Sequence, residues 1–151
     1  MKNSKHGEMG QSLFEVVVAI GVIAIVIVGI VSVATSTIRN TSFTRNKALA
    51  TRYTQEAIEW LRGQRDTNWV TFHTNADTPP RIYCLDTLSW TNSGVCGASE
   101  TIGGDTILLR QVAFSNIVPA EITANVTVSW TDSQGTHQVT TSTVFTDWRS
   151  R

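Results

Sequence analysis

The apolar residues of this chain are concentrated in one block near its N-terminus. From Val16 to Ala34 the sequence VVVAIGVIAIVIVGIVSVA runs for nineteen residues without a charged side chain. An uncharged apolar run of about 18 residues or more is long enough to cross a bilayer as a helix, whereas buried strands are much shorter. The block therefore predicts a membrane-spanning helix. The remaining residues, rich in Thr, Ser and Asn, are left to form one small folded domain.

No proline occurs between Gln11 and Thr78, so this helix is predicted to continue beyond the span to about Asp66. Residues 11–35 form its apolar part, and residues 36–66 form an amphipathic continuation in which apolar side chains recur at spacings of three and four. Those side chains are Leu49, Tyr53, Ala57, Trp60 and Leu61. We expect this stripe to pack on the globular domain.

Between residues 67 and 104 the periodicity disappears, and Pro79-Pro80 and Gly103-Gly104 interrupt the pattern. A long connecting region is predicted there. The two cysteines of the chain, Cys84 and Cys96, lie in this region without a nearby histidine to complete a metal set. In an exported protein they would pair and close a loop of about thirteen residues. Two free buried thiols are the alternative.

Residues 105–151 alternate between two faces and predict an antiparallel sheet. The positions predicted to face the core are Ile107, Leu109, Gln111 and Ala113, then Ile122, Ala124, Val126, Val128 and Trp130, then His137, Val139, Thr141, Thr143 and Phe145. Asp132-Ser133-Gln134-Gly135 predicts a hairpin connection, with Gly135 available for a positive φ. The expected fold class is α+β, a long N-terminal helix packed on a small antiparallel sheet.

Charge and composition argue against several classes of function. Twelve basic residues balance twelve acidic ones and form no Lys/Arg cluster, so a nucleic-acid-binding surface is not expected. His73 and His137 lie far apart and in no catalytic motif, and no glycine-rich phosphate loop occurs. We therefore expect no catalytic residues, no cofactor and no metal site. Of the five tryptophans, Trp69 and Trp90 are expected to be the most exposed.

Glu15, at the edge of the apolar block, is unusual, because a carboxylate in or beside a membrane span is costly. It belongs to the segment Gly10-Gln11-Ser12-Leu13-Phe14-Glu15, which is followed by Val16-Val17-Val18-Ala19-Ile20. These two segments together resemble the processing site of type IV prepilins and pseudopilins. In that family a membrane-embedded peptidase cuts after the glycine on the cytoplasmic side and methylates the new amine, and the glutamate is needed for assembly.

The resemblance implies a leader peptide of residues 1–10, cleavage between Gly10 and Gln11, and N-methylation of Gln11. It also implies roles in assembly for Glu15 and Leu13. For the fold, the resemblance implies the pilin fold, in which the first half of the long helix is transmembrane.

Later parts of the chain indicate which group within this family it resembles most. Residues 55–62 and 126–132 are similar to the helix end and the terminal hairpin of a group of minor pilins and related pseudopilins. The chain also departs from the major pilins, because Gln11 stands where phenylalanine is usual and no proline occurs midway along the apolar block. These features favour a minor component.

The function implied is that of a structural subunit of a type IV pilus. Such a subunit would wait in the bacterial inner membrane, with its leader in the cytoplasm and its C-terminal domain outside, and would then join a cell-surface filament. Its partners would be other pilin subunits, the prepilin peptidase, the inner-membrane assembly platform and, before assembly, the lipid bilayer. The alternatives are a pseudopilin of a type II secretion or DNA-uptake machine, a filament-tip binding or adhesion subunit, and an ordinary single-span anchor.

Overall fold

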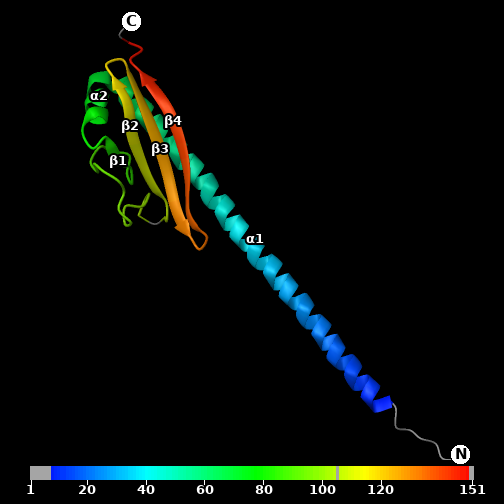
Figure 1. Cartoon of the computed structure of the whole chain (residues 1–151). Coiled ribbons are helices and arrows are strands. Elements are labelled where there is room, and N and C mark those ends of the chain that lie inside the picture. The colour runs from blue at the N-terminus through cyan, green and yellow to red at the C-terminus, as the bar shows by residue number, and fades with distance from the viewer. Residues whose placement is uncertain (1–7, 105, 150–151) are drawn as a thin grey trace, which may run out of the picture. The chain divides into compact units, whose positions relative to one another are not determined.

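The structure, a computed structural model, describes residues 8–104 and 106–149, with side chains described from residue 13 onward. Within these residues the elements follow one another along the chain as shown in Figure 1: α1 (Glu8–Thr67), α2 (Trp69–Asp77), β1 (Ile82–Cys84), β2 (Leu109–Val118), β3 (Glu121–Asp132) and β4 (Gly135–Thr146). This is an α+β layout, a long N-terminal helix and a small four-stranded antiparallel sheet, and it is consistent with the pilin fold. The chain divides into two compact units, Met1–Thr44 and Arg45–Arg151.

The first unit is helical from residue 8 to its end. Its threonines, which have a low intrinsic helix propensity, satisfy their hydroxyls inside the helix: Thr35 donates to the carbonyl of Val31 at 2.8 Å, and Thr37 donates to that of Val33 at 2.9 Å. No other element belongs to the described part of this unit.

The second unit is built on a sheet in which consecutive strands are neighbours, in the order β1-β2-β3-β4, and every pair is antiparallel. The β3–β4 hairpin turns through Ser133 and Gln134, because Asp132 and Gly135 are already paired. Gly135 has φ +123°, which favours glycine, and the Asp132 carboxylate accepts the backbone N–H of Gln134 at 2.8 Å. The predicted hairpin is confirmed.

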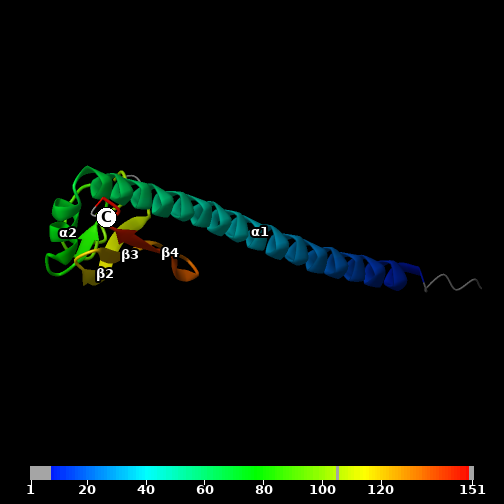
Figure 2. The same cartoon turned by 90° about the horizontal axis from the view of Figure 1, so that it is seen from above.

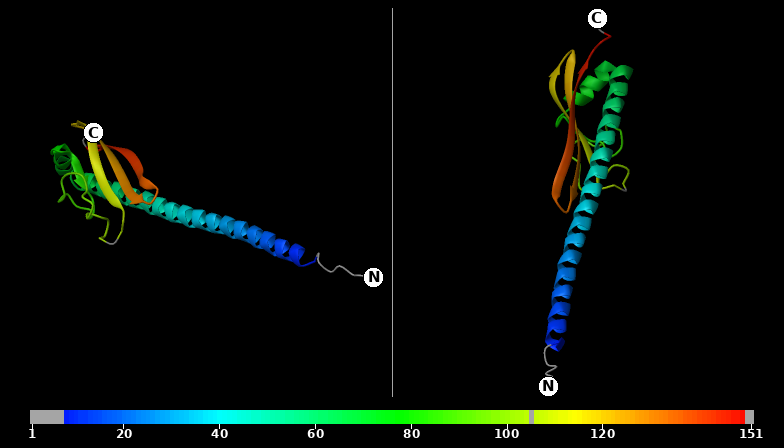
Figure 3. Two further views of the ribbon diagram at one scale, coloured as in Figure 1. Left: turned by 60° about the horizontal axis from the view of Figure 1, so that its bottom comes forward. Right: turned by 90° about the vertical axis from the view of Figure 1, so that its right-hand side faces the viewer.

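One face of the sheet is buried by residues 45–67 of α1 together with α2. In the right-hand view of Figure 3 the sheet lies on one side and both helices of this unit lie on the other, and Figure 2 shows the same arrangement from above. The core contains Ala57, Ile58 and Leu61 from α1, Phe72 and Ala76 from α2, and Val112, Phe114, Ile122, Ala124, Val126 and Phe145 from the strands. The predicted α1 stripe is confirmed at Ala57 and Leu61, which are fully buried.

The predicted inward faces of β3 and β4 are also confirmed. On β3 the predicted inward residues are all buried: Ile122, Ala124, Val126, Val128 and Trp130. On β4 the predicted inward residues are half-buried or, at Phe145, buried, and the residues between them are exposed. The sequence of β3 is sufficient to predict this face. Its apolar residues occupy every second position, so only one of the two faces can bury them together.

The predicted face of β2 was wrong by one residue. Leu108, Arg110, Val112 and Phe114 are buried, whereas Ile107 is exposed and Leu109, Gln111 and Ala113 face away from the core. A shift of one residue moves every side chain of a strand to the other face. The buried face includes a charged residue, Arg110, because its guanidinium reaches the carboxylate of Glu56 on α1.

The connecting region between residues 67 and 104 is more ordered than its sequence suggested, because it contains α2 and β1. Asn68 caps α2 by accepting the N–H of Thr71 at 3.0 Å, and Phe72 and Ala76, four residues apart, face the core. The N-cap and this spacing are the signal that could have identified α2. The abundance of Thr and Asn concealed it, since both have a low helix propensity.

The predicted disulfide is confirmed, with Cys84 and Cys96 joined and their Cα atoms 4.8 Å apart. Leu85 and Trp90 belong to the loop that the disulfide closes. Leu85 is fully buried, and Trp90 packs against the core with its indole N–H donating to Gln64 at 3.1 Å. Trp69 also packs against the core and is half-buried. The prediction that Trp69 and Trp90 are the most exposed tryptophans is therefore wrong. Trp148 is exposed instead, with 57% of its surface accessible.

Candidate functional site

The residues implied in processing lie at the limit of the described part of the chain. Gly10 and Gln11 belong to α1, and the structure describes the helical backbone there but not the side chain of Gln11. Residues 1–7 of the expected leader lie outside the described residues. Cleavage after Gly10 and methylation of Gln11 therefore stay predictions.

The two residues expected to act in assembly, Leu13 and Glu15, are both exposed on α1. No ion pair joins Glu15 to any other residue for which side chains are described. Residues three and four positions away on a helix are its surface neighbours, and those on the C-terminal side, Val18 and Ala19, are apolar. Among the residues whose side chains the structure describes, the carboxylate thus has apolar neighbours and no cationic partner.

The apolar block that follows is unburied throughout. It is the one segment of the described residues long and apolar enough to cross a membrane, with a mean hydropathy of 3.2 over its most apolar 18-residue window and none of that window buried. Ile25 and Val28, for example, expose 75% and 69% of their surface. Because apolar surface costs roughly 25 cal/mol per Å² in water, this helix requires lipid or other apolar partners around it.

A shallow groove marks one side of the block around two small residues, Gly29 and Ala34. It is lined by Val26, Gly29, Ile30, Val33 and Ala34 and has a volume of about 490 Å³. A Cβ atom built on Gly29 would meet nothing within 4 Å. In membranes, small residues allow two helix backbones to approach closely, so this side of α1 has the form that helix packing needs.

The second unit contains a buried charge that was not anticipated. The guanidinium of Arg110 on β2 donates to the Glu56 carboxylate on α1 at 3.0 Å and to the carbonyl of Leu85 at 2.9 Å. Burial lowers the pKa of Arg110, and the hydrogen bond and charge of Glu56 oppose this effect. These contacts tie α1, β2 and the segment after β1 together. Their geometry makes Arg110 part of the scaffold.

The C-terminal segment is tied to α1 by a polar contact. The indole N–H of Trp148 donates to the Asp66 carboxylate at 3.1 Å, and the guanidinium of Arg65 lies 2.9 Å from the same oxygen. The hydrogen bond from Trp148, and then that from Arg65, lower the pKa of Asp66.

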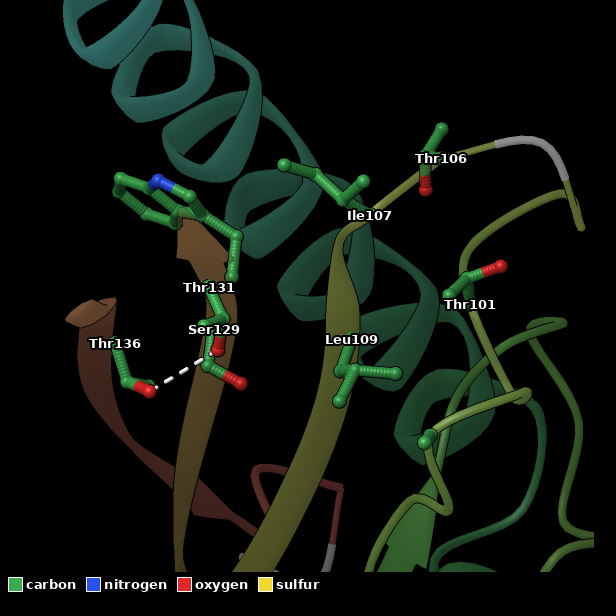
Figure 4. A pocket seen from close by; sticks show the side chains of 9 residues that line it. Thr101, Thr106, Ile107, Leu109, Ser129, Thr131 and Thr136 are labelled. Carbon is green, nitrogen blue, oxygen red and sulfur yellow. Dashed lines mark hydrogen bonds between the residues drawn. The ribbon is translucent and has the colours of Figure 1, made fainter. Parts of the chain in front are cut away.

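A pocket opens on the outer face of the sheet, the face turned away from the helices (Figure 4). It has a volume of about 420 Å³. Five of its side chains carry hydroxyls: Thr101, Thr106, Ser129, Thr131 and Thr136. Ala98, Ile107, Leu109 and Trp130 complete the lining. We call it the hydroxyl pocket. Sequence reasoning missed it, because its walls come from three strands and from a segment that precedes them.

The histidines and acidic residues of the described chain form no metal-binding group of three or more ligands. His73 lies 3.2 Å from the carbonyl of Val118, and His137 lies 3.1 Å from the Asp132 carboxylate. The two histidines thus have separate local partners.

Comparisons with protein-family models, with curated proteins and with solved structures found no significant match for this chain.

Proposed function

We propose that this chain is a minor subunit of a type IV pilus, processed after Gly10 and assembled through the N-terminal part of α1. The observation that carries the proposal is the combination of Glu15, the fifth residue after the proposed cut, with an apolar helix segment that no described part of the chain buries. A helix that is apolar all round belongs in lipid or among other helices, and a filament core supplies the second environment.

The proposed mechanism is an exchange of lipid for neighbouring helices. Apolar contact is nearly preserved in this exchange, so it supplies little selectivity. Cleavage after Gly10 would create an α-amine with a pKa of about 7.7 to 8, which is cationic at neutral pH and stays cationic after N-methylation. In a low dielectric this amine and the Glu15 carboxylate of a neighbouring subunit each relieve the cost of burying the other, and their pairing sets the register between subunits.

The same proposal places the chain in the bacterial inner membrane before assembly, with the sheet unit outside and the leader in the cytoplasm. Its partners there are the prepilin peptidase, the assembly platform, other pilin subunits and lipid. Pseudopilins of type II secretion and DNA-uptake machines use the same N-terminal chemistry, so the genes beside this one would identify the machine.

The N-terminal mass of the chain, after expression together with a prepilin peptidase, tests the processing step. A mature chain that begins with N-methylated Gln11 is expected. A chain that keeps Met1 under these conditions would contradict the proposal.

Glu15→Gln and Glu15→Ala test the assembly step. Both should leave insertion into the inner membrane unchanged and abolish incorporation into sheared filaments, because the carboxylate is needed only for pairing between subunits. Glu59→Gln is the matched control, since Glu59 is an exposed carboxylate of α1 that pairs locally with Arg62. Normal incorporation of the Glu15 variants would rule out the mechanism.

A further inference from the structure

The outer face of the sheet carries almost no charge. The side chains that point away from the helices are Leu109, Gln111, Ala113 and Ser115 on β2, Glu121, Thr123, Asn125, Thr127, Ser129 and Thr131 on β3, and Thr136, Gln138, Thr140, Ser142, Val144 and Thr146 on β4. Glu121, at one end of β3, is the only charged residue in this set. Solvent-facing sheet surfaces normally carry charged residues, since these keep exposed strands soluble.

The hydroxyls of this face are held in place by one another. Thr127 and Thr140 hydrogen bond across β3 and β4 at 3.0 Å, and Thr131 and Thr136 do the same at 3.0 Å. A hydroxyl has one proton to donate and two lone pairs, so each paired hydroxyl retains capacity for a further hydrogen bond. The face is therefore an ordered array of neutral donors and acceptors.

The hydroxyl pocket lies at one end of this array. Figure 4 shows Ser129 and Thr131 on β3 and Thr136 on β4, with Thr101 and Thr106 on the segment that precedes β2. Ile107 and Leu109 add apolar surface to the same cavity. None of the described residues that line it is charged. Its volume of about 420 Å³ is within the range of small-ligand sites, which is roughly 300 to 1,000 Å³.

This chemistry selects among ligand classes. A phosphate or carboxylate needs a cationic partner and a nucleic acid needs several, but none of the described lining residues is cationic. The core of a protein interface is rich in aromatic residues and arginine, and the described side chains that β2, β3 and β4 point outward include neither. A purely apolar ligand would strip water from five hydroxyls without replacing it. A neutral saccharide satisfies both kinds of surface, because its hydroxyls pair with Ser and Thr while its C–H groups contact Ile107 and Leu109.

We propose that the hydroxyl pocket binds one unit of a neutral saccharide. This inference goes beyond the proposed filament function and does not depend on it, since none of the pocket residues belongs to α1. Binding would give the sheet unit a specific contact with a carbohydrate.

Saturation-transfer-difference NMR on the full chain in detergent micelles tests the proposal with N-acetylglucosamine and cellobiose as neutral probes and glucuronic acid as the charged counterpart. Dissociation constants in the millimolar range suit this method, and probes at about 10 mM would saturate a useful fraction of the pocket. We expect saturation transfer to a neutral probe and little to glucuronic acid. No transfer to either neutral probe, or stronger transfer to glucuronic acid, would overturn the proposal.

Substitutions on the outer face locate the binding site. Ser129→Lys fills the pocket with a charged chain and should reduce transfer by about tenfold or more. Thr136→Lys adds a charge to the same pocket at an exposed position, where a lysine should not disturb folding, and should reduce transfer in the same way. Val144→Lys adds the same charge to the same face outside the pocket and should leave transfer unchanged. Equal transfer in Ser129→Lys, Thr136→Lys and the unmodified chain would also overturn the proposal.

The two proposals fail separately. Ser129→Lys should enter filaments as the unmodified chain does, because it leaves Glu15 and α1 intact. Loss of saccharide binding with normal assembly supports the pocket. Loss of assembly in the Glu15 variants with normal saccharide binding supports the filament mechanism.

Discussion

The two ends of α1 show how one helix can meet two different requirements. From residue 13 to residue 44 every side chain is exposed except the half-buried Phe43. From residue 45 onward the same helix buries Ala50, Thr54, Ala57, Ile58 and Leu61 against its own sheet. Residues 16–34 of the first part are apolar on nearly all sides, whereas the second part is apolar on one stripe and largely polar or charged elsewhere. The first part therefore needs apolar surroundings from outside the chain to cover its side chains, whereas the second part is covered by the core of its own domain.

The largest expected effect separates the two units directly. Phe72 is 1% exposed and meets Phe145 with ring centroids 5.3 Å apart. Phe72→Ala should lower the free energy of unfolding of the sheet unit by about 3 to 5 kcal/mol through lost burial and a cavity. Urea denaturation followed by near-UV circular dichroism in detergent measures it. Val26→Ala, in the apolar block, should leave this transition unchanged; an equal loss in both variants would remove the distinction between the units.

The disulfide sharpens the comparison inside the sheet unit. Cys84 and Cys96 are separated by 12 positions, and a loop of about this length contributes close to 3 kcal/mol in the chain-entropy model. The Cys84→Ala/Cys96→Ala double variant should therefore unfold at a lower urea concentration. A reductant should destabilise the unmodified chain and leave the double variant unaffected. A reductant effect of the same size on both would point to another cause.

The buried Arg110 tests how the second half of α1 is fastened to the sheet. Glu56→Ala leaves a buried guanidinium without its carboxylate and should cost about 1 to 2 kcal/mol, the lower part of the usual range because Glu56 is 49% exposed. Arg110→Met removes the charge and keeps the bulk, so it should cost less than Glu56→Ala. Thermal denaturation of the two variants measures the order. If Arg110→Met were the more destabilising of the two, the ion pair itself would be a net source of stability.

The smallest expected effect is a loss of stability of the sheet unit at low pH. The N–H of Gln134, and then His137, lower the pKa of Asp132 below its ordinary value of 3.8. A lowered folded-state pKa contributes stability above the unfolded-state pKa and loses it as the pH falls through the folded-state value. The stability of the sheet unit should thus decline below about pH 4, and Asp132→Asn should make the decline shallower. Thermal denaturation between pH 5 and 2 measures it, and a decline equally steep in Asp132→Asn would exclude Asp132 as a cause.

Several features followed from the sequence because their causes are local. The apolar block specifies a helix of membrane length through nineteen consecutive uncharged residues. Alternation along β3 and β4 specifies which residues are buried, since a shift by one would expose the whole apolar set. Of the candidate site residues, Leu13 and Glu15 could be identified only by resemblance, and their exposure is consistent with a partner outside the chain.

Other features were decided by contacts between segments far apart in the chain. The burial of Arg110 on β2 depends on its contact with Glu56, fifty-four positions earlier, which the sequence around β2 does not reveal. The order of α2 depends on Phe72 finding Phe114 and Phe145. The hydroxyl pocket exists only because the segment before β2 folds beside Ser129 and Thr136. Local periodicity indicates which residues are buried. Only the tertiary structure decides which buried residues contact one another, because a contact depends on two segments that can be far apart in the chain.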